Sequence, residues 1–253
     1  MTQTPHGYQE NGEDLRSYDR PSMTVDLALL TVRSGALHAL LTRRDSRPFE
    51  GHWALPGGFV RIDESLGAAA RRVLRDKAHL AEAFIEQLYT FGAVGRDPRG
   101  RVVTVAYYAL VDEEQLAAAR QASDSLVLGE IVVPWPGEAG GPVQLHSDEG
   151  AVLPLAFDHA DILGMAVKRL RGKLDYSPVG FELLPKRFTL RQLQEVHEAI
   201  LGTKLNKPAF RRRMLDKGVL HATGARETGA TYRPAELYRF IERSAATPME
   251  KEG

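Results

Sequence analysis

The sequence lacks cysteine, net charge and any long apolar segment. Without cysteine the chain has no disulfide framework, no zinc–thiolate site and no thiol nucleophile. Its longest apolar run, Val102–Val111, is ten residues long and contains a threonine and two tyrosines; it is about half of a membrane span. The first twenty residues are polar and of mixed charge, so neither a signal peptide nor a transit peptide is expected. We therefore expect a cytoplasmic protein that does not enter the membrane.

The chain has 253 residues, of which 43% are hydrophobic. This is enough to bury a real core in one large domain or two modest ones. The zero net charge conceals an uneven distribution. Residues 183–243 hold thirteen basic and six acidic side chains, whereas residues 1–182 hold nineteen and twenty-five. An acidic body with a basic C-terminal module is typical of a protein in which one domain contacts nucleic acid.

The hydrophobic pattern predicts a mixed α+β domain over residues 23–156, after a flexible arm at residues 1–22. Two strands joined by a Ser34-Gly35 turn form a hairpin, and a helix follows the Pro56-Gly57-Gly58 cluster. Further strands follow the helix, and residues 134–142 form a surface loop. The expected strands are 23–33, 36–44, 85–94, 101–111 and 130–133, and the expected helix is Glu64–Ala78.

A helix over Phe157–Leu174, within a connection at residues 157–182, leads to a second domain at residues 183–243. There the pattern predicts helices at Thr189–Leu201 and Lys207–Lys217. Strands at Val219–Ala222 and Thr231–Arg233 then flank a glycine-rich loop. Helix, turn, helix and β-hairpin is the order of a winged helix-turn-helix domain. Residues 244–253 are expected to be a flexible tail.

The most specific motif is Trp-Ala-Leu-Pro-Gly-Gly-Phe-Val at residues 53–60, followed by Glu64 and, eight residues later, Arg72. Glycines let a backbone approach a phosphate closely. The loop and these two residues resemble a Nudix box. The resemblance implies a Nudix-like α/β/α sandwich over the first domain, with an anion-binding cleft at the motif.

Nudix hydrolases carry three glutamates one, four and five residues after the arginine, on one helical face, where they hold Mg²⁺. This chain has Val73, Asp76 and Lys77 there, and His79 where a glycine is expected. Valine cannot ligate a metal and an ammonium group repels one. We therefore predict no catalytic residue, no metal site and no metal-assisted hydrolysis. As a hypothesis, Lys77 supplies the positive charge that Mg²⁺ would bring to a bound diphosphate.

The predicted cleft residues come from the motif, its helix and the preceding loop. Arg43 and Arg44, with Arg47, lie between the hairpin and the motif, where they either reach an anionic ligand or are solvated loop charges. The alternative for the motif itself is a tight turn at the glycines and an ion pair that orients the helix. The candidate effector-binding residues are Arg43, Arg44, Trp53, Gly57, Gly58, Glu64, Arg72 and Lys77.

The basic module supplies a candidate DNA surface. Thr189 is a credible N-cap, and Pro208 suits the first turn of the next helix, which directs Phe210 and Leu215 inward. His197 is expected to be an interface residue and not a metal ligand. The alternative is a solvated charged helix in a small interaction domain. The candidate DNA-binding residues are Thr189, Asn206, Lys207, Arg211, Arg212, Arg213 and, in the glycine-rich loop, Arg226.

The two domains together resemble the Nudix-related transcriptional regulators of NAD metabolism, the NrtR-like family. Phe188–Gln194, Asn206–Arg213, Tyr232–Phe240 and Ala156–Ile162 carry this resemblance, although Pro208-Ala209 departs from a more direct Asn-Phe-Arg-Arg arrangement. The resemblance implies a homodimeric repressor that binds a palindromic operator beside genes of NAD synthesis or salvage. It also implies that ADP-ribose or a related NAD-derived nucleotide binds the cleft and alters DNA affinity, with no cofactor required.

Two functions of other classes are open alternatives. One is an active ADP-ribose pyrophosphatase with an accessory C-terminal domain, for which Val73 and Lys77 are unsuitable. The other is a nucleotide sensor that acts through a protein partner and shows no salt-sensitive DNA binding.

Overall fold

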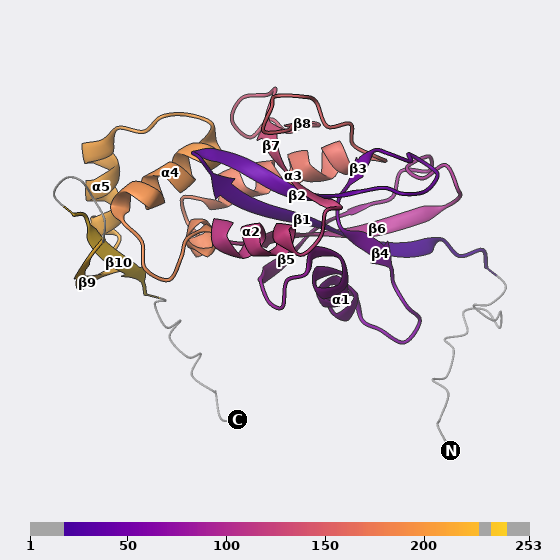
Figure 1. Ribbon diagram of the computed structural model, residues 1–253, viewed down its shortest axis with the longest axis horizontal. Coiled ribbons are helices and arrows are strands. Elements are labelled where there is room, and N and C mark those ends of the chain that lie inside the picture. The colour runs from indigo at the N-terminus through magenta and orange to yellow at the C-terminus, as the bar shows by residue number, and fades with distance from the viewer. Residues whose placement is uncertain (1–17, 228–233, 242–253) are drawn as a thin grey trace, which may run out of the picture.

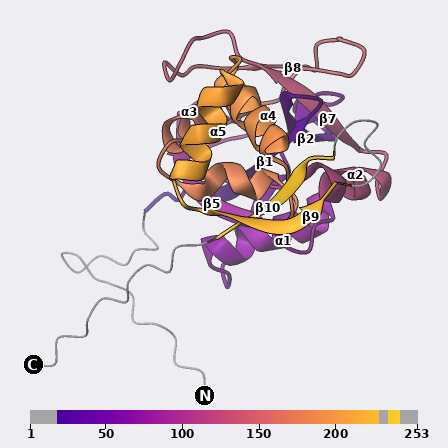
Figure 2. The same ribbon diagram turned by 90° about the vertical axis from the view of Figure 1, so that its left-hand side faces the viewer.

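The computed structural model describes residues 18–227 and 234–241. The predicted tail, most of the predicted arm and the predicted strand Thr231–Arg233 lie outside these residues. Figures 1 and 2 show the arrangement from two directions, with the C-terminal helices gathered at one end of the molecule. In the described ranges, no helix combines the length and the apolar character that a membrane crossing requires.

The N-terminal domain is built on one mixed sheet. The strand order is β5-β6-β1-β2-β7-β8, with β3 paired to β2 and β4 paired to β1. β1 pairs in parallel with β6 and antiparallel with β2 and β4. β1 is therefore the central strand. The strands are β1 (Ser22–Arg33), β2 (Ala36–Arg43), β3 (Trp53–Ala54), β4 (Gly57–Phe59), β5 (Phe84–Phe91), β6 (Val102–Leu110), β7 (Leu126–Val132) and β8 (Gln144–His146).

Helices cover both faces of this sheet. Side chains alternate along β1, so Leu27 and Leu29 pack under α1 (Leu66–Ala78) and α2 (Glu113–Gln121), whereas Ala28 and Leu30 pack under α3 (His159–Lys173). Figure 1 shows α1 and α3 on opposite sides of the strands. The result is the expected α/β/α sandwich.

Two local expectations need correction. The helix α1 begins at Leu66 and not at Glu64, because the Ser65 side chain accepts a hydrogen bond from the backbone N–H of Ala68 and caps the helix. The helix α2 was not predicted, although Asp112 caps it by accepting from the N–H of Gln115. His79, where a glycine was expected, ends α1 in the left-handed conformation with φ 53°; this explains the preference for glycine there.

The C-terminal module is the expected winged helix. It consists of α4 (Leu190–Leu201), α5 (Lys207–Asp216) and the hairpin β9 (Leu220–Arg226) with β10 (Glu236–Phe240), preceded by the 3₁₀ helix η2 (Pro178–Leu183). β10 lies later in the chain than the predicted partner strand. Its residue Tyr238 also forms an antiparallel bridge with Phe188. Phe210 is buried as predicted, but Leu215 is exposed and Met214 points inward instead.

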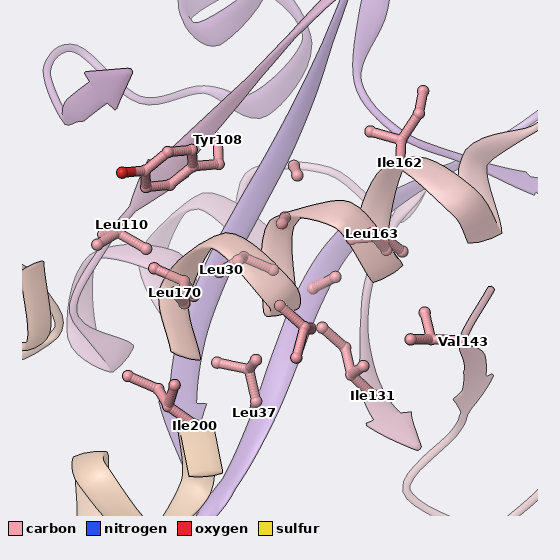
Figure 3. Close-up of a cluster of buried hydrophobic side chains, with 14 of the residues drawn as sticks. Leu30, Leu37, Tyr108, Leu110, Ile131, Val143, Ile162, Leu163, Leu170 and Ile200 are labelled. Carbon is pink, nitrogen blue, oxygen red and sulfur yellow. The ribbon is translucent and has the colours of Figure 1, made fainter. Parts of the chain in front are cut away.

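The two domains share one hydrophobic cluster, and the winged helix has a further cluster of its own around Phe188, Leu193 and Phe210. Val196 and Ile200 of α4 belong to the same buried cluster as Leu37 of β2 and Leu170 of α3. Figure 3 shows Ile200 beside Leu37 and Leu170. The winged helix is therefore seated against the sandwich through packed side chains.

His197 is buried where α4 meets α5. Its ring packs edge-on against Phe210 with centroids 5.0 Å apart, and its Nδ1 has no hydrogen-bond partner among the described residues. Burial, together with the positive charges of Arg213 and Lys217, lowers the pKa of His197 to about 4. The residue lies at an interface, as expected, and is neutral at physiological pH.

His197 makes stability sensitive to acid. Its pKa is near 6.5 in the unfolded chain and about 4 in the folded chain, so below pH 6.5 only the unfolded chain takes up this proton. His197 leaves the free energy of unfolding undiminished above pH 6.5. That free energy then falls by about 3 kcal/mol as the pH reaches about 4. Urea titrations at pH 7, 5.5 and 4.5 give the free energy of unfolding at each pH. His197→Phe is expected to lose less of this free energy between pH 7 and 4.5 than the wild type does. An unchanged slope of stability against pH in the variant would contradict the assignment.

Candidate functional site

A cleft of about 630 Å³ lies beside the glycine-rich turn. It is formed by the start of β1, the end of β2, the loop after β2, the end of α1 and the turn before β6. Five of the eight candidate residues line it: Arg43, Arg44, Gly57, Gly58 and Lys77.

The other three candidates lie away from the cleft. Trp53 packs against the hydrophobic core under α3. Arg72 donates to both carboxylate oxygens of Glu64, at 3.0 and 2.5 Å, and to the carbonyl of Phe59 at 3.0 Å. Hydrogen bonds from Arg72 and from the backbone N–H of Arg61 lower the pKa of Glu64 to about 2. This ion pair fastens the loop after β4 to α1. Its position is that of the expected alternative, an ion pair that orients the helix.

A buried charge network lies at the floor of the cleft, and the sequence pattern did not predict it. Arg96, in the turn between β5 and β6, donates to Asp158 at 2.9 and 2.6 Å and approaches Asp26 at 3.4 Å. The backbone N–H of Leu55 donates to Nδ1 of His159 at 3.0 Å, and burial lowers the pKa of that imidazole. His159 is therefore a neutral acceptor that fixes the glycine-rich turn to the start of α3.

An aromatic side chain lines the cleft between two arginines. The guanidinium of Arg44 lies 4.8 Å from the ring centroid of Phe157, and that of Arg99 lies 5.7 Å from it. Phe157 has a φ of 55°, which is unusual for a bulky residue. The cleft therefore combines cationic groups with a flat apolar surface, as a nucleotide-like ligand requires.

The charges of the cleft suit an anion that needs no metal. Arg99 is neutralised by Asp97 and Arg96 by Asp158. Arg43, Arg44 and Lys77 have no acidic partner in the described part of the chain. They line the cleft together with Asp45 and Asp76, and they are the cations available to hold a diphosphate.

The residues present do not form a Mg²⁺ site. Val73 is buried in the core below Gly58, and Asp76 supplies one carboxylate to a cleft that Lys77 also lines. Within the described ranges, no three His, Asp or Glu side chains are grouped so as to hold a metal ion. Hard cations require more oxygen ligands than this arrangement supplies.

The second candidate surface is the outer side of α5. Phe210 and Met214 face inward, so the opposite side of the helix is centred on Arg212. Arg211 is exposed next to it, and Lys207 is exposed in the first turn of the helix. Arg213 instead points back to Asp175, at 3.6 Å, after the end of α3. The outward side of α5 thus presents two of the three consecutive arginines.

Three further candidates are engaged in local structure. Thr189 is buried, and its hydroxyl accepts a hydrogen bond from the backbone N–H of Gln192 in a capping box. Its predicted contact with DNA stays a prediction. Asn206 is exposed and caps α5 through Oδ1, which accepts from the N–H of Ala209. Arg226 lies at the end of β9 and not in the glycine-rich loop.

These features define a two-domain protein in which a Nudix domain precedes a winged-helix DNA-binding domain. A NUDIX domain model matches residues 22–128, and a model of the NrtR DNA-binding winged helix domain matches residues 180–240. The chain belongs to the NrtR family.

The comparisons with individual proteins agree with this family. The ADPR responsive transcriptional repressor NtrR of Acinetobacter baylyi is 40% identical over 225 residues, which cover 88% of this chain and 83% of the relative. The structure of Shewanella oneidensis NrtR complexed with a 27mer DNA has a TM-score of 0.70 and 36% identity, covering 86% of this chain and 93% of that one. An ADP-ribose pyrophosphatase of Methanocaldococcus jannaschii is 33% identical over 110 residues, 44% of this chain and 63% of the relative. The Acinetobacter repressor and the Shewanella protein each match more than four fifths of this chain, whereas the pyrophosphatase matches less than half of it.

Gly57 is expected to tolerate no side chain. A Cβ there would lie 2.2 Å from Oδ1 of Asp26 and 3.0 Å from the carbonyl oxygen of Val25, whereas at Gly58 the nearest atom is 3.4 Å away on Val73. Gly57→Ala should therefore destabilise the protein by roughly 1–3 kcal/mol, as other overpacked positions do. Gly58→Ala, the matched control, should cost clearly less in the same urea titration. Equal losses for the two variants would contradict the close approach of Asp26.

Proposed function

We propose that this chain is a transcriptional repressor whose DNA binding responds to ADP-ribose held in the Nudix cleft. One observation carries the proposal: the same molecule combines a cation-lined cleft without metal ligands and a winged helix with arginines on its outward side. The name of the Acinetobacter relative and the DNA complex of the Shewanella protein support it.

The second candidate function is hydrolysis of ADP-ribose, which the archaeal pyrophosphatase relative favours. The chemistry of the cleft argues against it. Val73 is buried where a ligating carboxylate would be needed, and Lys77 repels a divalent cation. We therefore propose that the cleft binds its nucleotide without turnover. Incubation with ADP-ribose and Mg²⁺ should release no AMP.

We further propose that the repressor is a cytoplasmic homodimer. Two winged helices related by a two-fold axis would read the two halves of a palindromic operator. The genes under its control would be those of NAD synthesis or salvage, because ADP-ribose is a product of NAD breakdown. The residues proposed to meet DNA are Asn206, Lys207, Arg211, Arg212 and Arg226, and those proposed to meet the effector are Arg43, Arg44, Gly57, Gly58 and Lys77.

The central test is fluorescence anisotropy with duplex DNA from the region upstream of the protein's own gene. Binding should be specific and should weaken steeply with salt, because each phosphate contact releases counterions. ADP-ribose should change the Kd for this DNA, and a coupling of about 3 kcal/mol corresponds to a ~150-fold change. Absence of binding at low salt would contradict the proposal.

A matched pair of variants sharpens this test. Arg212→Ala removes a cation from the outward side of α5 and should reduce the salt slope by about one. Arg213→Ala removes the neighbouring arginine, which faces Asp175, and should leave the slope unchanged. Equal effects would mean that α5 is not oriented toward DNA as described.

Lys77 is expected to hold the negative charge of the effector in place of a metal. Lys77→Glu should weaken ADP-ribose binding, measured by calorimetry, roughly tenfold to a hundredfold, the usual range for a lost charged hydrogen bond. Chelation of divalent ions should leave the wild-type affinity unchanged. Arg75→Glu, which reverses an exposed charge on the same helix outside the cleft, is the control. An unaltered affinity for Lys77→Glu would exclude the role.

A further inference from the structure

The first end of α3 is fastened to the floor of the effector cleft. Asp158 occupies the N-cap position of this helix, but its side chain makes no capping hydrogen bond. Both of its carboxylate oxygens instead accept from Arg96, which lines the cleft. The next residue, His159, holds the backbone of Leu55. Any ligand group that engages Arg96 therefore acts directly on the beginning of α3.

The other end of α3 is fastened to α4. Arg171 is buried and donates through Nε to the carbonyl of Ile200 at 2.8 Å. Its Nη1 donates to the carbonyl of Gly137 at 2.6 Å, and its guanidinium lies 4.9 Å from the ring centroid of Trp135. Ile200 is in the last turn of α4, where free carbonyls carry partial negative charge. One arginine thus joins α3 to the end of α4.

The segment that leaves α3 is fastened to α5. The carboxylate of Asp175 lies 3.6 Å from Arg213, and its backbone carbonyl accepts from Nζ of Lys217 at 2.7 Å. Both partners belong to the end of α5. The helix proposed to read DNA is therefore tied to the chain two residues beyond α3.

Between its two ends α3 is a continuous helix of 15 residues, about 22 Å long. Its buried face packs against the sheet, and Lys173 donates to both oxygens of Glu86 on β5, at 2.5 and 2.7 Å. Figure 1 shows α3 running along the sheet toward α4 and α5. A packed helix of this kind moves as a unit and not by bending.

We propose that α3 couples the cleft to the DNA-reading helix, with the Arg96–Asp158 pair as its joint at the cleft and Arg171 and Asp175 as its joints at the winged helix. The inference rests on the proposed function, and it names how that function is regulated. A diphosphate in the cleft offers Arg96 a further anion, besides Asp158 and Asp26, and competes with Asp158. Asp158 is then free to cap α3. The resulting shift of α3 displaces α4 and α5, which are joined to its other end. The ligand acts because it favours one of two packed arrangements over the other.

The decisive variant is Arg171→Gln, with Arg169→Gln as its matched control. Arg169 lies on the same helix, donates to the carbonyl of Leu88 and pairs with Glu86 at 3.7 Å, and both of these partners belong to β5 of the sandwich. For each protein the Kd for the upstream duplex is measured with and without saturating ADP-ribose, and ADP-ribose binding is measured by calorimetry without DNA. Arg171→Gln should keep both binding activities, but the ratio of the two DNA Kd values should fall to about a tenth of the wild-type ratio or less. Arg169→Gln should keep the wild-type ratio.

Asp175→Asn keeps the proposal testable if loss of the buried arginine unfolds the protein. Its carboxylate is exposed, so the substitution leaves the core intact while it removes the ion pair with Arg213. It should lower the ratio severalfold with unaltered ADP-ribose affinity. Wild-type ratios in Asp175→Asn and in a folded Arg171→Gln, or an equal loss in Arg169→Gln, would overturn the inference. A wild-type protein that binds no DNA, or ignores ADP-ribose, would instead contradict the proposed function itself.

Discussion

The packing of α3 between the sheet and α4 is the contact on which the rest of the molecule depends. One face of this helix is buried against both domains, through Ile162, Leu163, Ala166, Val167 and Leu170. Because α4 adds Val196 and Ile200 to the same cluster, a shift of α3 also disturbs the packing of the winged helix. A close-packed interior answers a local push by moving whole elements. Small shifts at the cleft are thus transmitted from the first domain to the second.

The proposed function requires a Nudix cleft that binds its nucleotide without hydrolysing it. Val73 replaces a ligating side chain with apolar volume that packs below Gly58, so a catalytic position has become part of the core. Lys77 and Arg43 supply fixed positive charge with no acidic partner in the described ranges. Fixed cations stabilise a bound diphosphate, but they provide no activated water, and catalysis requires stronger interactions in the transition state than in the ground state. These features are the ones that the proposed binding without turnover requires.

The sequence predicted the features that depend on local pattern. The hairpin of β1 and β2, the helices α3, α4 and α5, and the glycine-rich turn all follow from periodicity and capping. It missed Arg96, because the partners Asp26 and Asp158 are 70 and 62 residues away and meet it only through the pairing of β1 with β6. Thr189 was predicted both as an N-cap and as a DNA contact; the capping box confirms the first, and the second stays a prediction.

The charge of the C-terminal module is divided between holding the fold and facing outward. Arg191 pairs with Glu195, Lys204 with Glu198 and Arg213 with Asp175. These cations are already partly neutralised, so they contribute less to the field that a DNA phosphate experiences. Lys207, Arg211 and Arg212 have no acidic partner in the described residues, and all three are exposed on α5. Other exposed cations of this module, Lys186, Arg187 and Arg239, lie before α4 and on β10, so α5 carries part of the basic excess, and it is the helix that Asp175 ties to α3.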